Sequence, residues 1–594
     1  MSGWKGRVLS SVLLLALSTA TLAADAHKVL RVAFSAPETG FDPAKVSDVY
    51  SSAVTESVFD TLLGYDYLAR PARLVPNVLT AMPEVSADGK VYTFHLQRGI
   101  HFAPDPVFKG KKRELTAADF AYSIKRLADP AVGSPSSYLV TGKFVGLDAL
   151  VKKAGKGRLD YNAPVAGIAT PDRYTLRLTL TAPQPALPYI LAMPTLGAVA
   201  REVIKAYGNN THAHPVGTGP YMLREWKPGN HISLVVNPNF RKVVFHYRPG
   251  ADPLDQRIAR EMNGKTMPQI GRVEISVIQE EQPMWLAFRS GDLDMGGIPQ
   301  PVVRQALILD PKNPWRVALK PALQQKGVRL LRSLDEEITY FPFNMQDPVV
   351  GGYGKDKIAL RRAIAMAFNT DDTILNIRRN QAVKAQYLIP DNVAGHNPRF
   401  RAAVPYNPAL ANALLDRFGY RLGPDGKRRQ PDGRPLVVDF ITGPTAVDKQ
   451  WNEYWQQAFD AIKVRVNFRV MQWNEQGKTL RDCQYGMAGA AWLADYPDGD
   501  NFVQLLYGKN VGDSNLACYR SARFDKLYEA AARAPDGPAR NQLYDQMNKV
   551  FMADTPWVLG ETRFRNLLVQ RWVLGAKPHP QLMSMWRYLD IVGR

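Results

Sequence analysis

A carboxylate stands between aromatic residues in the stretch Trp492-Leu493-Ala494-Asp495-Tyr496-Pro497-Asp498. The small residues before it, 486–491, are typical of a buried strand that ends where another group must approach the backbone. Pro497-Asp498-Gly499-Asp500 then turns the chain away. This arrangement suits a bound cation, because the carboxylate supplies charge, the rings exclude water and backbone groups add hydrogen bonds. The alternative is a core Trp beside an Asp that caps a helix.

Motifs of the common enzyme sites are missing from the sequence. It has neither a His-Glu-x-x-His zinc helix nor a Gly-x-Ser-x-Gly nucleophile elbow, and 351–355 lacks the spacing of a phosphate loop. Val216-Gly217-Thr218-Gly219-Pro220 lacks the third glycine of a dinucleotide fingerprint, and Pro220 removes an amide donor. We therefore expect a protein that is not an enzyme and that binds no cofactor.

Two polar clusters are weaker candidates for a metal-binding or catalytic site. His212-Ala213-His214 could belong to a metal site, but no Cys or further His is close in sequence, so a polar loop is the alternative and we expect no metal. Asp335-Glu336-Glu337 fits a solvated loop better than a general acid and base.

The N-terminus has the character of a secretory signal peptide over residues 1–24. Lys5 and Arg7 precede an apolar run, and Thr21-Leu22-Ala23-Ala24 offers small residues for cleavage. No later apolar run is long enough to span a bilayer. We therefore expect a soluble periplasmic protein.

The net charge of +20 raises the question of a nucleic-acid partner. The basic clusters at 109–113, 152–158 and 427–429 lie among Gly and Pro, and no aromatic-interleaved basic motif accompanies them. They are typical of solvated loop tips, so we expect no nucleic-acid partner.

Cys483 and Cys518 are the only cysteines. An even pair in an exported chain favours a disulfide, which would close a loop of about 35 residues. Two ordinary buried thiols are the alternative.

The hydrophobic pattern predicts the elements that must position these residues. Alternation at 92–96 and 174–180 predicts antiparallel strands, and a capping box at Thr116-Ala117-Ala118-Asp119 begins a helix between them. Strands at 437–441 and 464–470 with a helix between them favour a βαβ unit and a mixed sheet. Residues 300–340, with few apolar periods, are consistent with a crossing between lobes.

Several segments, taken in order, resemble the solute-binding family 5 of ABC importers, the extracytoplasmic peptide- and nickel-binding proteins. The resemblance runs from about residue 30 to about residue 570. Its strongest pieces are Phe41-Asp42-Pro43, Tyr92 to Phe102, Leu115 to Ile124, Val216 to Tyr221 with Trp226, Ser290 to Asp294, Leu360 to Ile364, and Trp492 to Asp498.

The resemblance implies an α/β fold, a clamshell like the type II periplasmic binding proteins, with two mixed-sheet lobes and an additional α+β domain. On that pattern lobe I comprises residues 25–69, 201–339 and 561–594, the additional domain 70–200, and lobe II 340–560. The ligand would lie between lobes that are joined by two strand crossings.

The resemblance also implies a function, that of the substrate-binding protein of an ABC importer. A peptide would lie extended between the lobes with its amino terminus held by Asp495, and a monomer would deliver it to a permease in the inner membrane. The implied contacts on lobe II are Trp492, Leu493, Tyr496 and Asn344, and those on lobe I are Phe34 and Glu38.

The chain departs from the family where the ligand carboxylate should be bound. The loop 442–449 has no Arg, and Gly489 stands where oligopeptide binders can place one, leaving Lys449, Arg378 and Arg379 as candidates. The alternatives are therefore a non-peptide solute, such as a nickel chelate or haem with His396 or His214 in the cleft, and a secreted hydrolase.

Overall fold

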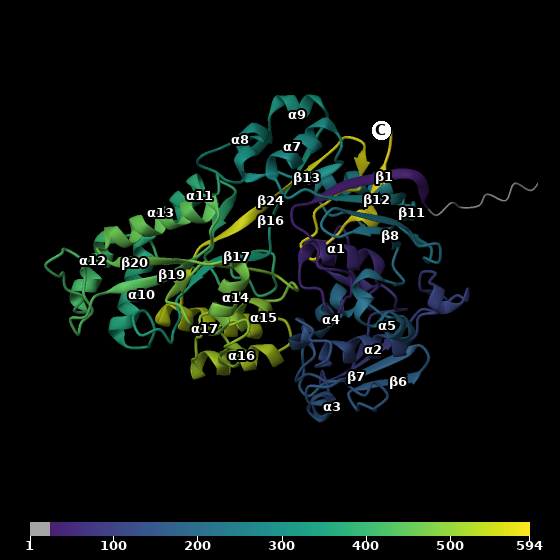
Figure 1. Ribbon diagram of the computed structural model, residues 1–594, viewed down its shortest axis with the longest axis horizontal. Coiled ribbons are helices and arrows are strands. Elements are labelled where there is room, and N and C mark those ends of the chain that lie inside the picture. The colour runs from purple at the N-terminus through teal and green to yellow at the C-terminus, as the bar shows by residue number, and fades with distance from the viewer. Residues whose placement is uncertain (1–23) are drawn as a thin grey trace, which may run out of the picture.

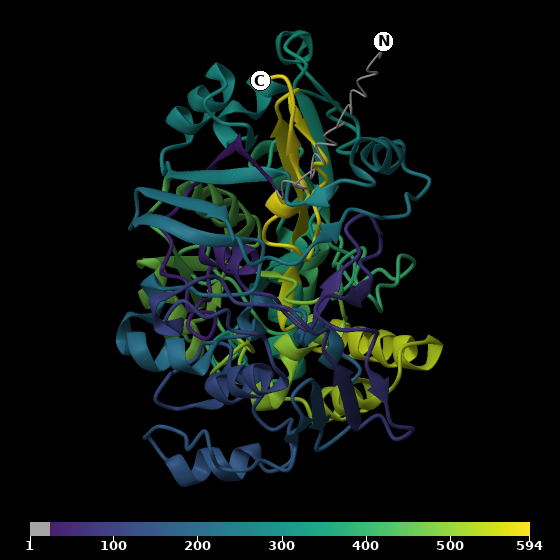
Figure 2. The same ribbon diagram turned by 90° about the vertical axis from the view of Figure 1, so that its right-hand side faces the viewer.

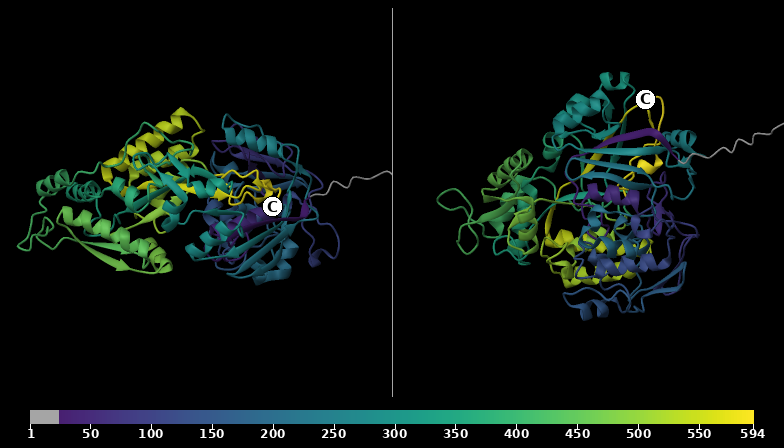
Figure 3. Two further views of the ribbon diagram at one scale, coloured as in Figure 1. Left: turned by 90° about the horizontal axis from the view of Figure 1, so that it is seen from above. Right: turned by 45° about the vertical axis from the view of Figure 1, so that its right-hand side comes forward.

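The structure is a computed structural model that describes residues 24–594. Residues 1–23 of the expected signal peptide 1–24 lie outside the described residues. Figure 1 shows one body at the left, built from the elements of lobe II, and a second at the right, with lobe I above the additional domain. Viewed from above, the two bodies lie side by side (Figure 3). Among residues 24–594, no helix combines the length and the apolar character that crossing a bilayer requires.

Lobe I is built on a sheet of order β1-β12-β9-β8. Its first two strands are parallel and the others antiparallel. Leu30, Val32 and Phe34 alternate into the core, as the period of a half-buried strand requires. The main elements are β1 (Asp25–Phe34), α1 (Val49–Val58), α5 (Arg201–Tyr207), β8 (Tyr221–Lys227), β9 (His231–Val236), α6 (Pro253–Met262), β12 (Ile270–Val277), α7 (Glu281–Ser290) and β13 (Met295–Gly297).

In lobe I, the glycines of Val216-Gly217-Thr218-Gly219-Pro220 allow this loop to pack closely against α1. A Cβ atom at Gly217 would collide with the carbonyl of Val58 at the end of α1, and one at Gly219 would lie 2.8 Å from the carbonyl oxygen of Ser57. The Gly219 amide donates to Val58 O at 2.8 Å. The glycines therefore let this loop lie directly against the last turn of α1.

The additional domain is an antiparallel sheet of order β4-β5-β7-β6 packed against α2. The two alternating segments are antiparallel strands, as predicted, and they pair with each other as β5 and β7. Thr116 and Asp119 form the predicted capping box at the start of α2. The elements are β4 (Glu84–Val85), β5 (Val91–His95), α2 (Ala117–Ala128), α3 (Leu147–Ala154), β6 (Ile168–Asp172), β7 (Thr175–Thr179) and α4 (Leu187–Ile190).

Lobe II contains two sheets, β22-β17-β23 and β20-β19-β21. The predicted βαβ unit is confirmed, since β19 and β20 are parallel and α13 connects them. The elements are β17 (Glu337–Pro342), α10 (Lys355–Ala367), α11 (Thr370–Asn376), β18 (Ala382–Lys384), α12 (Pro408–Arg417), β19 (Val437–Thr442), α13 (Ala446–Ala461), β20 (Arg465–Val470), α14 (Trp473–Arg481), β21 (Met487–Ala488), β22 (Ala490–Leu493), α15 (Asp500–Val503), α16 (Ala522–Arg533), α17 (Pro538–Asp554) and β23 (Trp557–Leu559).

Two antiparallel strands connect the lobes. β16 (Arg329–Leu334) leads directly into β17, and β24 (Glu561–Val569) returns along it after β23. Figures 1 and 2 show β24 in yellow, running through the middle of the molecule. The remaining C-terminal segment lies on lobe I, where β25 (Val573–Leu574) pairs with β26 (Asp590–Ile591).

Acidic side chains cluster where these strands cross. Glu336 and Glu337 are 1% and 0% exposed, so the interpretation of this run as a solvated loop was wrong. Three of the carboxylates have an Arg partner, in the pairs Asp335 with Arg565, Glu337 with Arg563 and Glu561 with Arg378.

Glu336 lacks such a partner among the described residues. Its Oε2 accepts a hydrogen bond from Gln581, and its Oε1 is buried with no hydrogen-bond partner there. Burial, only partly offset by the hydrogen bond from Gln581, raises the pKa of Glu336 to about 8.

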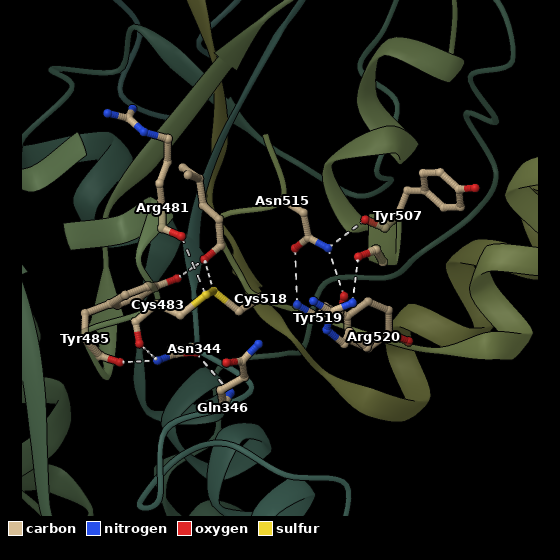
Figure 4. The surroundings of a disulfide bond; sticks show 12 residues. Asn344, Gln346, Arg481, Cys483, Tyr485, Tyr507, Asn515, Cys518, Tyr519 and Arg520 are labelled. Atoms are coloured by element: carbon tan, nitrogen blue, oxygen red, sulfur yellow. Dashed lines mark hydrogen bonds between the residues drawn. A yellow bond between two sulfur atoms is a disulfide. The ribbon is translucent and has the colours of Figure 1, made fainter. Parts of the chain in front are cut away.

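A disulfide joins Cys483, which follows α14, to Cys518, and the Cα atoms are 6.2 Å apart (Figure 4). Asn344 lies beside it and donates to the carbonyl oxygens of Cys483 at 2.7 Å and Tyr485 at 2.8 Å. The bond therefore ties the loop after α14 to the segment before α16, and the chain between them carries Asp495.

Replacing Cys483 and Cys518 with Ser should lower the free energy of unfolding by about 3 to 4 kcal/mol, because the unfolded chain regains the entropy of an open loop. Urea denaturation of the two forms measures the difference. A reducing agent should cause a similar loss in the parent protein and none in the double variant. Equal unfolding midpoints for both proteins would contradict a stabilising bond.

The raised pKa of Glu336 predicts a pH-dependent stability. Because the folded state favours the neutral carboxyl, its contribution is complete below the unfolded pKa near 4.5 and is lost as the pH rises through about 8. In Glu336→Gln, the free energy of unfolding should fall less between these pH values than in the parent. The exposed Glu453→Gln on α13 is the control. Parallel pH profiles for parent and E336Q would refute the raised pKa.

Candidate functional site

The loop that carries Asp495 is fixed by one asparagine. Asn501 Oδ1 accepts hydrogen bonds from Trp492 Nε1 at 2.9 Å and from the Asp495 amide at 3.0 Å. Asn501 Nδ2 donates to Asp495 Oδ2 at 3.0 Å. α15 therefore holds both the ring and the carboxylate in place as the chain leaves β22.

A buried ion pair anchors the turn that follows. Asp498 and Arg540 are 1% and 2% exposed at their side chains and share two hydrogen bonds, of 2.6 and 2.9 Å. Asp498 Oδ1 also accepts from the Asp500 amide at 2.8 Å. A bidentate Arg and carboxylate pair fixes orientation as well as distance, so α17 positions the turn rigidly.

A cavity of about 350 Å³ lies beside Asp495, and we call it the Asp495 cavity. All parts of the molecule contribute to it, which places it at the junction of the two lobes and the additional domain. Its lining is Pro43, Val46, Ser47, Asp48, Val49, Ser52, Thr55 and Tyr65 from lobe I; Pro135, Ser136, Tyr138, Ala192, Met193, Pro194 and Thr195 from the additional domain; Leu493, Ala494 and Asp495 from lobe II; and Gln581 and Met583 from the C-terminal segment.

The charge of this cavity is negative, because its lining contains two carboxylates and no Lys, Arg or His. Asp48 uses both oxygens within lobe I: Oδ1 accepts from the Ser51 amide and Oδ2 from the Thr39 hydroxyl, both at 2.7 Å. Asp495 is therefore the carboxylate that is available to a bound molecule.

Asp495 itself is half-buried and forms no ion pair with any residue that the structure describes. Its Oδ2 accepts from Tyr138 at 3.1 Å and from Asn501, whereas its Oδ1 accepts no hydrogen bond from any residue within 24–594. Burial raises the pKa of Asp495, and the hydrogen bonds from Asn501 and Tyr138 offset part of that shift. A cation at Oδ1 would supply the missing charge compensation.

The predicted lobe II residues surround this carboxylate in different ways. Leu493 lines the cavity with Asp495, and Trp492 is half-buried and bonded to Asn501. Tyr496 is buried below the loop, where its hydroxyl donates to Asp500 Oδ2 at 2.9 Å and its ring packs into the core of the additional domain. Tyr496 thus joins lobe II to that domain next to the cavity.

The structure does not bring the other three predicted contacts to this cavity. Phe34 is buried in the core of lobe I, with its ring 5.1 Å from that of Tyr50. Glu38 Oε1 accepts from Trp226 Nε1 at 2.5 Å, and Asn344 is bonded to backbone beside the disulfide. Each of these side chains has a partner within its own lobe.

The histidines considered for a metal or haem are also occupied. His214 stacks on Tyr207, with ring centroids 3.9 Å apart, and His396 Nε2 lies 3.2 Å from Asp391. Neither lines the Asp495 cavity. In the part of the chain that the structure describes, His, Cys, Asp and Glu nowhere form a group of three that could bind a metal ion.

Three further residues lie at the site and were not predicted: Tyr138 and Gln581, which line the cavity, and Asn501, which bonds to Asp495. Asn501 follows the Pro-Asp-Gly turn and lies at the start of the short helix α15. Asn side chains at such positions often hydrogen-bond to the neighbouring loop, so its role could have been predicted from the sequence. Tyr138 is 357 residues from Asp495 in the sequence, and Gln581 comes from the C-terminal segment. No local pattern places either of them at this cavity.

The edge of the β22 sheet is a second feature of the site. Among the strands within residues 24–594, β17 is the one with which β22 pairs, and the Ala494 amide continues that ladder by donating to Glu336 O at 2.8 Å. In an antiparallel pair, the amide and carbonyl groups of successive residues point alternately toward the partner strand and away from it. Because the Ala494 amide points toward β17, the amide and carbonyl groups of Ala491 and Leu493 point away from it. An extended chain could pair with this open edge as it approaches Asp495.

Comparison with known proteins agrees with this architecture. Di/tripeptide-binding protein 2 of Pseudomonas aeruginosa (strain UCBPP-PA14) is 25% identical over 556 residues, 92% of each chain. Heme-binding protein A of Haemophilus influenzae is 24% identical over 526 residues, 87% of this chain and 84% of that relative.

Among solved structures, the periplasmic binding protein DppA from Helicobacter pylori in complex with peptide STSA matches with a TM-score of 0.70 at 23% identity, covering 95% of this chain and 98% of that one. The predicted fold of a type II periplasmic binding protein is thereby confirmed. Residues 73–514 match the sequence profile of the bacterial extracellular solute-binding proteins, family 5. Because this match spans most of the chain, the protein belongs to that family.

Proposed function

We propose that this protein binds peptides at the Asp495 cavity as the periplasmic, monomeric substrate-binding component of an ABC importer, and passes them unchanged to a membrane permease. The observation that carries the proposal is the position of Asp495. It lines a cavity at which none of the residues 24–594 places a cationic side chain, and its Oδ1 accepts no hydrogen bond from them. A peptide ammonium group would form a charge-assisted hydrogen bond there.

The open edge of β22 supports an extended peptide over a compact cation. Ala491 and Leu493 offer backbone groups immediately before Asp495, so the first residues of a peptide can pair with the strand while its amino terminus binds the carboxylate. Main-chain pairing contributes affinity for any side chain. Leu493, which lines the cavity beside Asp495, shapes the space near the first residue of the peptide.

Both lobes and the additional domain line the Asp495 cavity, which supports a cycle of opening, ligand binding and closure. A ligand that contacts lobe II at Asp495 and lobe I at the α1 side touches both only when the lobes are together, and so it favours the closed form. Two relatives, one named for di- and tripeptide binding and one for oligopeptide binding, are each 25% identical to this chain, over 556 and 547 residues.

Native mass spectrometry of the protein isolated from the periplasm, followed by denaturation and sequencing of the released material, tests the ligand class. We expect intact peptides with free amino termini. Release of an N-acetylated peptide, an anion without an amine, or cleavage products of an added peptide library would each refute the proposal.

Asp495→Asn should weaken the binding of a peptide with a free amino terminus by about thirtyfold to several thousandfold, because the ammonium loses its charged partner inside the cavity. Isothermal titration calorimetry measures the change. Affinity in the parent should also fall as the pH decreases through the pKa of Asp495, because a cation binds the ionised carboxylate, whereas D495N should lack this dependence.

Asp482→Asn, an exposed change at the end of α14, is the matched control and should bind as the parent does. Unchanged affinity in D495N, with the same melting temperature as the parent, would remove Asp495 from the site.

A further inference from the structure

A cavity of about 560 Å³ lies within lobe II, and we call it the lobe II cavity. Among residues 24–594, none lines both this cavity and the Asp495 cavity. β23 lines the lobe II cavity and β22 carries Leu493 to the Asp495 cavity, and these strands are opposite edges of the sheet β22-β17-β23. The lobe II cavity is therefore a separate space, and its volume lies within the range of about 300 to 1,000 Å³ that is typical of small-molecule sites.

The wall of the lobe II cavity is largely apolar. It is formed by β23, α10, the end of α17 and the loop before α12, with the side chains of Met366, Val404, Phe551, Trp557, Val558 and Leu559. The four contributed by α17 and β23 are buried. Hydrocarbon that filled this space would leave water and cover apolar surface, and both changes are favourable.

The charge of the lobe II cavity is positive. Its lining contains Arg362 and Lys549, and no Asp or Glu among the residues that the structure describes. Lys549 is exposed and forms no ion pair with any residue from 24 to 594, so it stands at the rim. The lobe II cations considered for a ligand carboxylate line neither cavity: Arg378, Arg379 and Lys449.

Arg362 is fixed in place but retains unused donors. Its Nη2 donates to Met552 O at 2.9 Å and Ala553 O at 3.0 Å, and its Nε donates to Thr555 Oγ1 at 3.3 Å. These bonds hold the half-buried guanidinium at the C-terminal end of α17. Its Nη1 donates no hydrogen bond, and the group forms no ion pair, with any described residue. Two of its five N–H groups are therefore available to a ligand.

A buried hydroxyl group also lines the lobe II cavity. Thr370, at the start of α11, is 3% exposed, and its hydroxyl forms no hydrogen bond with any residue that the structure describes. Buried polar groups in proteins are nearly always hydrogen-bonded. The Thr370 hydroxyl and Arg362 Nη1 are therefore two donors that a polar group in this cavity could satisfy.

The combination of an apolar wall and unused cationic donors restricts the ligand. A small inorganic anion would satisfy the donors but leave the wall in contact with water. An uncharged hydrocarbon would cover the wall but leave the donors without a partner. A cation would be repelled by both Arg362 and Lys549.

We infer that the lobe II cavity binds an amphiphile with one anionic head and an apolar body, the chemistry of a fatty acid. The head binds Arg362, Lys549 adds positive charge at the rim, and the chain lies against the apolar wall. This site goes beyond the proposed function and does not depend on it, because it lies apart from the Asp495 cavity.

Dodecanoate and dodecyltrimethylammonium test the inference, because they carry the same chain with opposite charges. Isothermal titration calorimetry on the full-length protein, below the concentrations at which either forms micelles, measures both affinities. The parent should bind one dodecanoate, and the cationic amphiphile should bind at least about tenfold more weakly, since it cannot accept from the guanidinium.

Two variants test the position of the site. Arg362→Gln should weaken dodecanoate binding by about tenfold to a hundredfold, because the head loses a charge-assisted hydrogen bond. Ala403→Trp should prevent binding, because Ala403 is half-buried in the lining and the larger ring would occupy the space of the chain. Arg523→Gln, an exposed change on α16 that lines neither cavity, is the matched control and should bind as the parent does.

Thermal melting checks that each variant is folded, and A403W replaces R362Q if the loss of the contacts to α17 unfolds the latter. Dodecanoate affinity that is unchanged in the folded variants would overturn the inference. So would equal affinity of the parent for the two amphiphiles, or no binding of dodecanoate. Because no peptide is used, each of these results leaves the proposed function untouched, and a failure of peptide binding leaves this inference standing.

Discussion

An ionisable group with an unused oxygen in an enclosed cavity is the feature on which this site depends. Removing a carboxylate from water is unfavourable unless hydrogen bonds or a cation compensate it. From residues 24–594, the Asp495 carboxylate receives two hydrogen bonds, both at Oδ2. Asn501 and the Asp498–Arg540 pair keep the group in this position. The protein therefore maintains a local energetic cost that a cationic ligand can relieve.

At the crossing between the lobes, the buried carboxyl groups are either paired with arginine or neutral. Asp335, Glu337 and Glu561 each have an arginine partner, and Glu336 is held neutral by burial. The free-energy cost of burying a carboxyl group is small when the group is neutral or paired with an arginine. The strands that join the lobes can therefore exclude water without presenting an uncompensated charge to a ligand. Asp495 lines the cavity without such compensation from any described residue, and on this contrast rests the proposal that it binds a cation.

The sequence predicted the elements better than it predicted contacts between them. The strands, the βαβ unit and the Asp495 loop follow from patterns within a few residues, where periodicity and turn chemistry decide the structure. Phe34 illustrates the limit: Leu30 and Val32 share its face of β1, so the same alternation that predicts the strand directs its ring into the core of lobe I. Tyr138 reaches Asp495 across 357 residues, a contact that only the assembled fold determines.

The lining of the Asp495 cavity relates the proposed recognition to closure. Asp495 and Leu493 belong to lobe II, whereas Asp48 and Thr55 line the same cavity from lobe I. A ligand that contacted Asp495 alone would gain little from closure, because its contacts would lie on one lobe. Under the proposed function, a peptide held at Asp495 that also contacts the lobe I lining has a higher affinity for the closed form, and the difference in affinity between the two forms drives closure.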